Sequence, residues 1–140
     1  MQGTIISLFS KRDSGKPMQP AHSLDLVAGK GIKGDAAYGR TRRQVLFVDQ
    51  AILEEFALRP GDLRENITVA GIDLRHVTAG SVVTIGQASL LVQGECTPCS
   101  KMDEIRPGLK NAIREQRGIL ASVLQDGTIH VGETVEISSA

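Results

Sequence analysis

The stretch Ser81-Val82-Val83-Thr84-Ile85-Gly86-Gln87-Ala88-Ser89-Leu90-Leu91-Val92-Gln93 carries the strongest β-strand signal of this 140-residue chain. Two apolar runs, residues 81–85 and 89–93, flank a short turn that contains Gly86. This pattern predicts a β-hairpin. The second run leads directly into residues 94–101, so we expect the hairpin to fix the position of that loop.

The loop Gly94-Glu95-Cys96-Thr97-Pro98-Cys99-Ser100-Lys101 holds both cysteines of the chain, spaced as C-x-x-C. A thiolate is a nucleophile and a metal ligand, and it is favoured by nearby positive charge such as that of Lys101 and of a helix start, which we expect near Pro107. The alternative is a pair of small buried side chains in a strand-to-helix connection. A four-thiolate zinc site would need a second cysteine pair, and a thioredoxin-like site would need a βαβ setting. We expect the loop to present a thiolate to a cofactor or a labile sulfur atom.

The composition indicates an ordinary globular chain, with 41% hydrophobic and 23% charged residues. The length favours a single domain over residues 1–140. A formal net charge of zero gives no global field for nucleic acid or an anionic membrane surface, and 3% aromatic residues argue against a base-stacking platform. No apolar run reaches the length of a membrane span, and the N-terminal residues lack the basic segment of a secretory signal. We therefore expect a cytoplasmic protein with reduced cysteines.

The rest of the chain predicts a mostly-β fold, a barrel or a sandwich, with two short inserted helices. A helix is expected after Asp49 as N-cap, and a second one from Pro107 to Gly118. Asp126-Gly127 is a strong turn signal that predicts a second hairpin. The expected strands outside the first hairpin are residues 4–9, 23–27, 44–48, 66–69, 120–125, 128–131 and 133–137.

A glycine-rich, basic segment spans residues 29–43. Gly29-x-Gly31-x-x-Gly34 matches the dinucleotide-binding spacing, but the βαβ unit that this fingerprint requires is missing. The segment offers backbone amides and five cations for an anion, while a solvated basic loop is an equally good interpretation. The five cations are Lys30, Lys33, Arg40, Arg42 and Arg43.

A further polar segment covers residues 61–66 and contains Arg64-Glu65-Asn66. The planar fork of Arg64 suits a phosphate or a carbonyl edge, and Asn66 is both donor and acceptor. A turn with ordinary caps is the alternative.

The three histidines, His22, His76 and His130, lack the spacing of metal ligands.

Taken in order, several of these stretches resemble the MOSC domain, a family named after the C-terminal domain of molybdenum cofactor sulfurase. The resemblance covers nearly the whole chain. It rests on Gly31-Ile32-Lys33-Gly34-Asp35, Arg43-Gln44-Val45, Pro60-Gly61-Asp62-Leu63-Arg64-Glu65-Asn66-Ile67-Thr68, Gly80 with Ile85-Gly86, Pro98-Cys99, and Gly127-x-Ile129-x-x-Gly132-Glu133-x-Val135.

The resemblance implies a MOSC-type β-barrel that binds molybdenum cofactor, with Cys99 as the catalytic cysteine and metal ligand and Cys96 as an auxiliary residue. It implies reduction of N-hydroxylated substrates with electrons from a partner protein. In the alternative that the family suggests, Cys99 carries sulfur as a persulfide received from a cysteine desulfurase. The cofactor-binding positions that the resemblance implies are Gly34, Asp35, Arg43, Arg64, Glu65, Asn66 and Lys101.

Two parts of larger relatives are not present in these residues: an additional N-terminal β-barrel domain and a pyridoxal-phosphate desulfurase domain. The family thus has a link to pyridoxal phosphate that this chain does not itself carry. Self-association or a separate partner is the expected way to complete the site.

Overall fold

A computed structural model of the chain describes residues 1–13 and 15–139. Its helices are α1 (Gln50–Glu55), α2 (Lys101–Ile105), α3 (Leu109–Ala112) and the 3₁₀ helix η1 (Leu74–His76). Its strands are β1 (Gln2–Ser10), β2 (Gln19–Ala21), β3 (Ser23–Val27), β4 (Gly31–Ile32), β5 (Val45–Asp49), β6 (Ile67–Ala70), β7 (Val82–Ile85), β8 (Ala88–Glu95), β9 (Ile119–Gln125), β10 (Gly127–His130) and β11 (Thr134–Ser138). None of these helices is long and apolar enough to cross a membrane.

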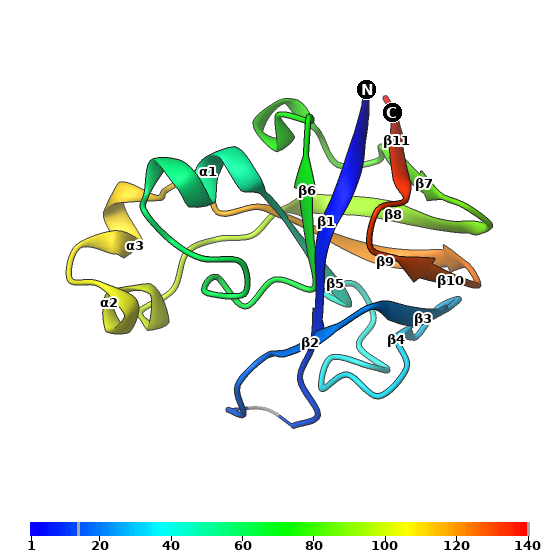
Figure 1. Cartoon of the computed structure of the whole chain (residues 1–140), viewed down its shortest axis with the longest axis horizontal. Coiled ribbons are helices and arrows are strands. Elements are labelled where there is room, and N and C mark those ends of the chain that lie inside the picture. Colours follow the sequence, from blue (N-terminus) through cyan, green and yellow to red (C-terminus); the bar gives the residue numbers. More distant parts are fainter. Residues whose placement is uncertain (14, 140) are drawn as a thin grey trace.

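The main sheet closes into a barrel. Its strand order is β11-β7-β8-β9-β5-β6-β1-β2, and β11 also pairs with β1, so that every strand of the sheet except β2 belongs to a closed ring. The ring is antiparallel except between β5 and β6. A smaller sheet, β10-β3-β4, packs beside the ring, while α1, α2 and α3 lie together on one side of it (Figure 1). The expected mostly-β barrel is confirmed, with three short α-helices in place of two.

Strand β5 is buried on both faces because two cores meet on it. Val45 and Phe47 belong to the core inside the barrel. Leu46 and Val48 belong to a second core that the three helices cover. This double burial explains why β5 is a continuous apolar run instead of an alternating one.

The hairpin of β7 and β8 forms as the sequence predicts, with Val82 opposite Leu91 and Ile85 opposite Ala88. Farther along β8, the register with β9 shifts between Val92 and Gly94. A bulge of this kind bends a strand and re-aims its end. It lies immediately before the cysteine loop and therefore helps to set the direction in which that loop leaves the barrel.

The predicted second hairpin is wrong. Strand β9 pairs with β8 and β5, and β10 pairs with β3. Both edges of β9 are therefore occupied, and no edge is left for β10. Asp126 is the single residue between β9 and β10. It ties the end of β9 to the end of β3, because its carboxylate accepts the N–H of Ala28 at 2.5 Å and the N–H of Gly29 donates to the carbonyl of Val123 at 2.9 Å.

The helical region after the cysteines also differs from the expectation. A first helix, α2, begins at Lys101, and Pro107 lies between α2 and α3. Leu109 and Ile113 are buried, as expected for the apolar face. Gly118 does not end a helix, because it lies directly before β9 with a φ of 145°.

Candidate functional site

A pocket of about 240 Å³ contains both cysteines and a group of cationic side chains in its walls. Segments far apart in the sequence contribute to it, from Lys11, directly after β1, to Leu120 in β9. The cationic residues that line it are Lys11, Arg40, Arg43, Arg64, Lys101 and Arg117. This grouping could not be read from the net charge, which is zero.

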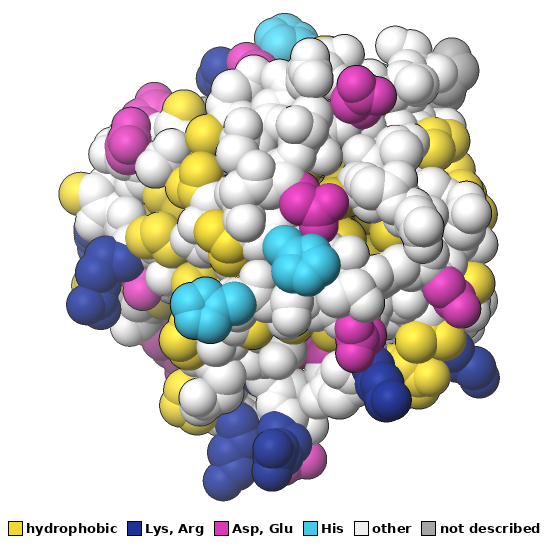
Figure 2. All heavy atoms as spheres, turned by 45° about the vertical axis from the view of Figure 1, so that its right-hand side comes forward, with side chains coloured by type: hydrophobic (Ala, Val, Ile, Leu, Met, Phe, Trp, Pro, Cys, Tyr) yellow, Lys and Arg dark blue, Asp and Glu magenta, His cyan; other side chains and the backbone are white. Residues whose placement is uncertain are grey.

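The cationic side chains that line this pocket outnumber its acidic ones. Asp35 is the carboxylate among the lining residues. In the part of the chain that the structure describes, none of the six cations lies within 4.0 Å of a carboxylate oxygen. By contrast, the face in Figure 2 shows acidic and basic side chains scattered without a patch of one sign. The pocket is therefore suited to an anionic ligand.

The pKa of Lys11 is lowered by burial and by the positive charges of the pocket. Burial lowers the pKa of Lys11 below its ordinary value of 10.5, and the nearby charges of Arg64 and Lys101 lower that pKa further. Asp35 opposes the shift. Bringing an anion into the pocket would favour the charged form of Lys11.

Asn66 holds three segments together at the pocket wall. Its side-chain oxygen accepts the N–H of Leu46 at 3.0 Å, and its side-chain nitrogen donates to the carbonyl of Phe9 at 3.2 Å. The same nitrogen lies 3.5 Å from a carboxylate oxygen of Asp35. Both donors and one acceptor position of Asn66 are thus used within the protein, so Asn66 positions the wall of the pocket.

Asp35 fixes the backbone of the basic segment, residues 29–43, at the pocket wall. Its carboxylate accepts the backbone N–H groups of Lys11 at 2.9 Å and Ala37 at 3.0 Å. Gly34, the preceding residue, has a φ of 85° and does not line the pocket. Gly34 therefore contributes the turn that places Asp35, through backbone conformation rather than contact.

Arg64 lines the pocket from a left-handed backbone conformation, with a φ of 62°. Such conformations are unfavourable for residues other than glycine and are often found at functional sites.

Glu65, the residue after Arg64, is fully buried and does not line the pocket. One Glu65 carboxylate oxygen accepts from Gly61 N and Thr68 Oγ1, each at 2.9 Å, while the other has no partner. Burial raises the pKa of Glu65 above 4.5.

The two cysteines have different environments. Cys96 is 4% exposed and belongs to the core beneath the helices, and its backbone N–H donates to the carbonyl of Gly118 at 2.8 Å. Cys99 is half-buried. Residues 96–99 contain neither a turn nor a bend. Of the two cysteines in the C-x-x-C pair, Cys96 packs in the core and Cys99 has the more accessible thiol.

The predicted site residues separate into two groups. Asp35, Arg43, Arg64, Asn66 and Lys101 line one pocket with Cys99, whereas Gly34 and Glu65 lie outside its lining. The roles of all of them stay predictions.

Sequence reasoning missed Lys11 and Arg117. Lys11 follows β1 among turn-forming residues, and Arg117 precedes β9 without any local motif. Only the tertiary fold brings them to Cys99.

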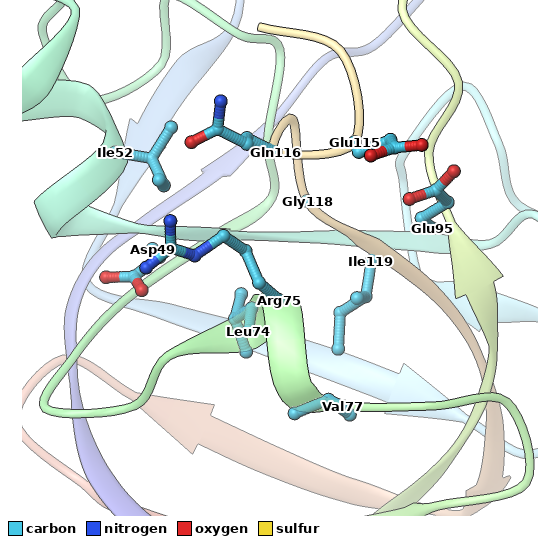
Figure 3. A pocket seen from close by; sticks show the side chains of 10 residues that line it. All are labelled: Asp49, Ile52, Leu74, Arg75, Val77, Glu95, Glu115, Gln116, Gly118 and Ile119. Atoms are coloured by element: carbon cyan, nitrogen blue, oxygen red, sulfur yellow. The ribbon is translucent and has the colours of Figure 1, made fainter.

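A second, smaller pocket of about 50 Å³ shares no lining residue with the cysteine pocket. Figure 3 shows Asp49 and Arg75 on one side of it and Glu95 and Glu115 on another. Its volume suffices for a few water molecules. In the described residues there is no group of three or more His, Cys, Asp or Glu side chains that could hold a metal ion.

The sequence profile of the MOSC domain matches residues 34–136, most of the chain. The chain belongs to the MOSC domain family. The family is linked to molybdenum cofactor binding. Nothing in the match supports a link of this MOSC domain to pyridoxal phosphate. Localisation, partners and oligomeric state stay predictions.

Solved structures share the fold of this MOSC domain. The YuaD protein of Bacillus subtilis has a TM-score of 0.88 and 24% identity, over 100% of this chain and 97% of YuaD. YiiM of Escherichia coli has a TM-score of 0.74 and 19% identity, over 100% of this chain and 71% of YiiM. YiiM of Geobacillus stearothermophilus has a TM-score of 0.75 and 19% identity, over 98% of this chain and 75% of that YiiM. No curated protein matches the chain.

Proposed function

We propose that this MOSC domain binds molybdenum cofactor and that the Cys99 thiolate is the protein ligand of the metal. The observation that carries the proposal is the meeting of one accessible thiol with six cations that have no carboxylate partner among the described residues. Thiolate sulfur is a soft ligand, which suits a molybdenum centre. Arginine and lysine are the side chains that bind phosphate groups.

The residues present fit such a group. Arg43, Arg64 and Lys101 would hold its phosphate and polar edges, and Asp35 and Asn66 would keep the wall in place. The cofactor, when bound, would supply two-electron chemistry at nitrogen–oxygen bonds.

The reaction that we propose is reduction of an N-hydroxylated compound. R–NHOH takes up two electrons and two protons, the N–O bond breaks, and R–NH₂ and water leave. The electrons would come from a separate electron-transfer protein. Lys11 Nζ is a suitable proton donor because Lys11 lines the pocket and burial lowers its pKa below the ordinary value of a lysine.

Metal content tests the proposal directly. The chain is produced in a host that makes molybdenum cofactor, purified, and analysed for molybdenum. We expect roughly one metal per chain, a loss of at least about tenfold in Cys99→Ala, and retention in Cys96→Ala, the matched control. Equal metal content in wild type and Cys99→Ala would contradict the assignment of Cys99.

The accessibility of Cys99 also favours a second candidate, sulfur transfer. The Cys99 thiolate would attack the outer sulfur of a persulfide on a cysteine desulfurase, forming a persulfide on Cys99 and releasing the desulfurase thiolate. A chain without molybdenum that carries cyanide-releasable sulfur after incubation with a desulfurase and cysteine would favour this function. Cys99→Ala should then carry no such sulfur.

A further inference from the structure

Arg117 is a buried cation that connects the two loops of the cysteine pocket. It is 8% exposed and lines the pocket. One of its terminal nitrogens donates to the carbonyl of Thr97 at 3.4 Å, and the other donates to the carbonyl of Leu63 at 3.1 Å. Thr97 lies between the two cysteines, and Leu63 precedes Arg64. Arg117 therefore bridges the Cys99 loop and the Arg64 loop.

The charge of Arg117 lacks compensation. No carboxylate of the described residues lies within 4.0 Å of it, and its Nε has no hydrogen-bond partner. A guanidinium has five N–H donors, of which the two hydrogen bonds to carbonyls use two. A buried charge without an opposite charge is costly, so such a residue is expected where a ligand supplies the missing anion.

We propose that Arg117 is the anion anchor of the pocket. The buried charge of Arg117 sets the affinity of the pocket for a phosphoryl-type anion. Its two hydrogen bonds keep the Cys99 loop against the Arg64 loop. The proposal rests on the proposed function only for the identity of the natural anion. Arg117 is thus a positioning residue for Cys99 and a binding residue for the ligand.

The test uses the chain without cofactor and inorganic pyrophosphate as the probe. Affinity is measured by titration calorimetry, and binding at this pocket is measured as protection of Cys99 from iodoacetamide. We expect Arg117→Gln, which keeps a planar donor but loses the charge, to weaken binding at least about tenfold and to abolish protection. Arg117→Lys keeps the charge but not the two-pronged guanidinium, and it should bind pyrophosphate more tightly than Arg117→Gln does. Arg114→Gln, an exposed arginine three residues earlier, controls for net charge and should bind like wild type.

A purely structural role would give a different pattern. Arg117→Lys and Arg117→Gln would then lose thermal stability alike while both kept the affinity for pyrophosphate, and this result would overturn the proposal. Equal weakening of binding in both variants would also overturn it, because charge would not be the determinant. The molybdenum content of the loaded chain is a separate measurement, so failure of the proposed function and failure of this inference are distinguishable.

If neither variant folds, the wild-type chain still gives an answer. Arginine Nε–H groups labelled with ¹⁵N are observed by NMR while pyrophosphate is added. The signal of the buried Arg117 Nε–H should move as the anion fills the pocket. An unchanged signal at saturating pyrophosphate would contradict the proposal.

Discussion

At the scale of the residue, Lys11 makes anion binding dependent on pH. Its pKa is lowered below the ordinary value of 10.5, so the range of pH in which Lys11 loses its proton and its charge lies lower than that of a free lysine. We expect the affinity of the wild-type chain for pyrophosphate to fall as the pH rises through this window. Lys11→Arg, which stays charged, should remove most of the fall. Titration calorimetry of both proteins at several pH values measures the difference, and parallel curves would contradict the role of Lys11.

Glu65 gives a pH effect on stability rather than on binding. Its folded pKa is raised above 4.5 by burial. Between 4.5 and the raised value, the unfolded chain has released this proton and the folded chain has kept it, so stability falls as the pH rises. We expect Glu65→Gln to match the stability of wild type below that window and to be more stable than wild type above it. Urea unfolding at a series of pH values provides the test, and a difference independent of pH would contradict it.

At the scale of the element, Gly118 determines how β9 can start. A side chain at this position would fall on the carbonyl oxygen of Phe47 in β5, and the φ of 145° is one that other residues rarely adopt. We expect Gly118→Ala to cost about 3 kcal/mol in the free energy of unfolding. The same change at Gly94, where an added Cβ meets nothing within 4 Å at a φ of 146°, tests the conformational part alone and should cost less. Equal losses in urea unfolding would show that the contact with Phe47 is unimportant.

The elements that the sequence predicts well are those decided by local pattern. The hairpin of β7 and β8 needs only two apolar runs and a glycine turn, and the helix after Asp49 needs only its cap, which the Asp49 carboxylate provides by accepting the N–H of Ala51 at 3.0 Å. Strand partners are decided by the whole sheet. Asp126-Gly127 favours a hairpin turn by its local pattern, whereas in the structure Asp126 is the single residue between β9 and β10, and β10 pairs with β3.

In the site, too, some residues could be predicted from local sequence, and others only from the tertiary fold. Cys99 and Arg64 stand in recognisable segments, so their importance could be expected. Arg117 has no motif, and its contacts with Thr97 and Leu63 join positions that only the folded barrel brings together. Glu65 and Gly34 lie in the predicted segments but outside the pocket lining, because neighbouring residues in a loop need not face the same way.

At the scale of the whole molecule, the barrel closes through the pairing of its first and last strands. Gly3 lies opposite Val135, and the backbone of Met1 exchanges hydrogen bonds with Ile137 at 3.1 and 2.8 Å. The N and C ends accordingly lie side by side in Figure 1. The seam joins residues that are 136 positions apart in the sequence.

This closure has a kinetic consequence. Contacts between distant positions carry a large entropy of loop closure, so we expect the seam to form after the folding transition state. Val135→Ala should then cost about 2 kcal/mol and act chiefly by accelerating unfolding, whereas Leu90→Ala, in the local hairpin, should slow refolding. Stopped-flow measurements in urea separate the two effects. Slower refolding of Val135→Ala would instead mean that the two ends of the chain meet early, and that the ring is the nucleus rather than the last event of folding.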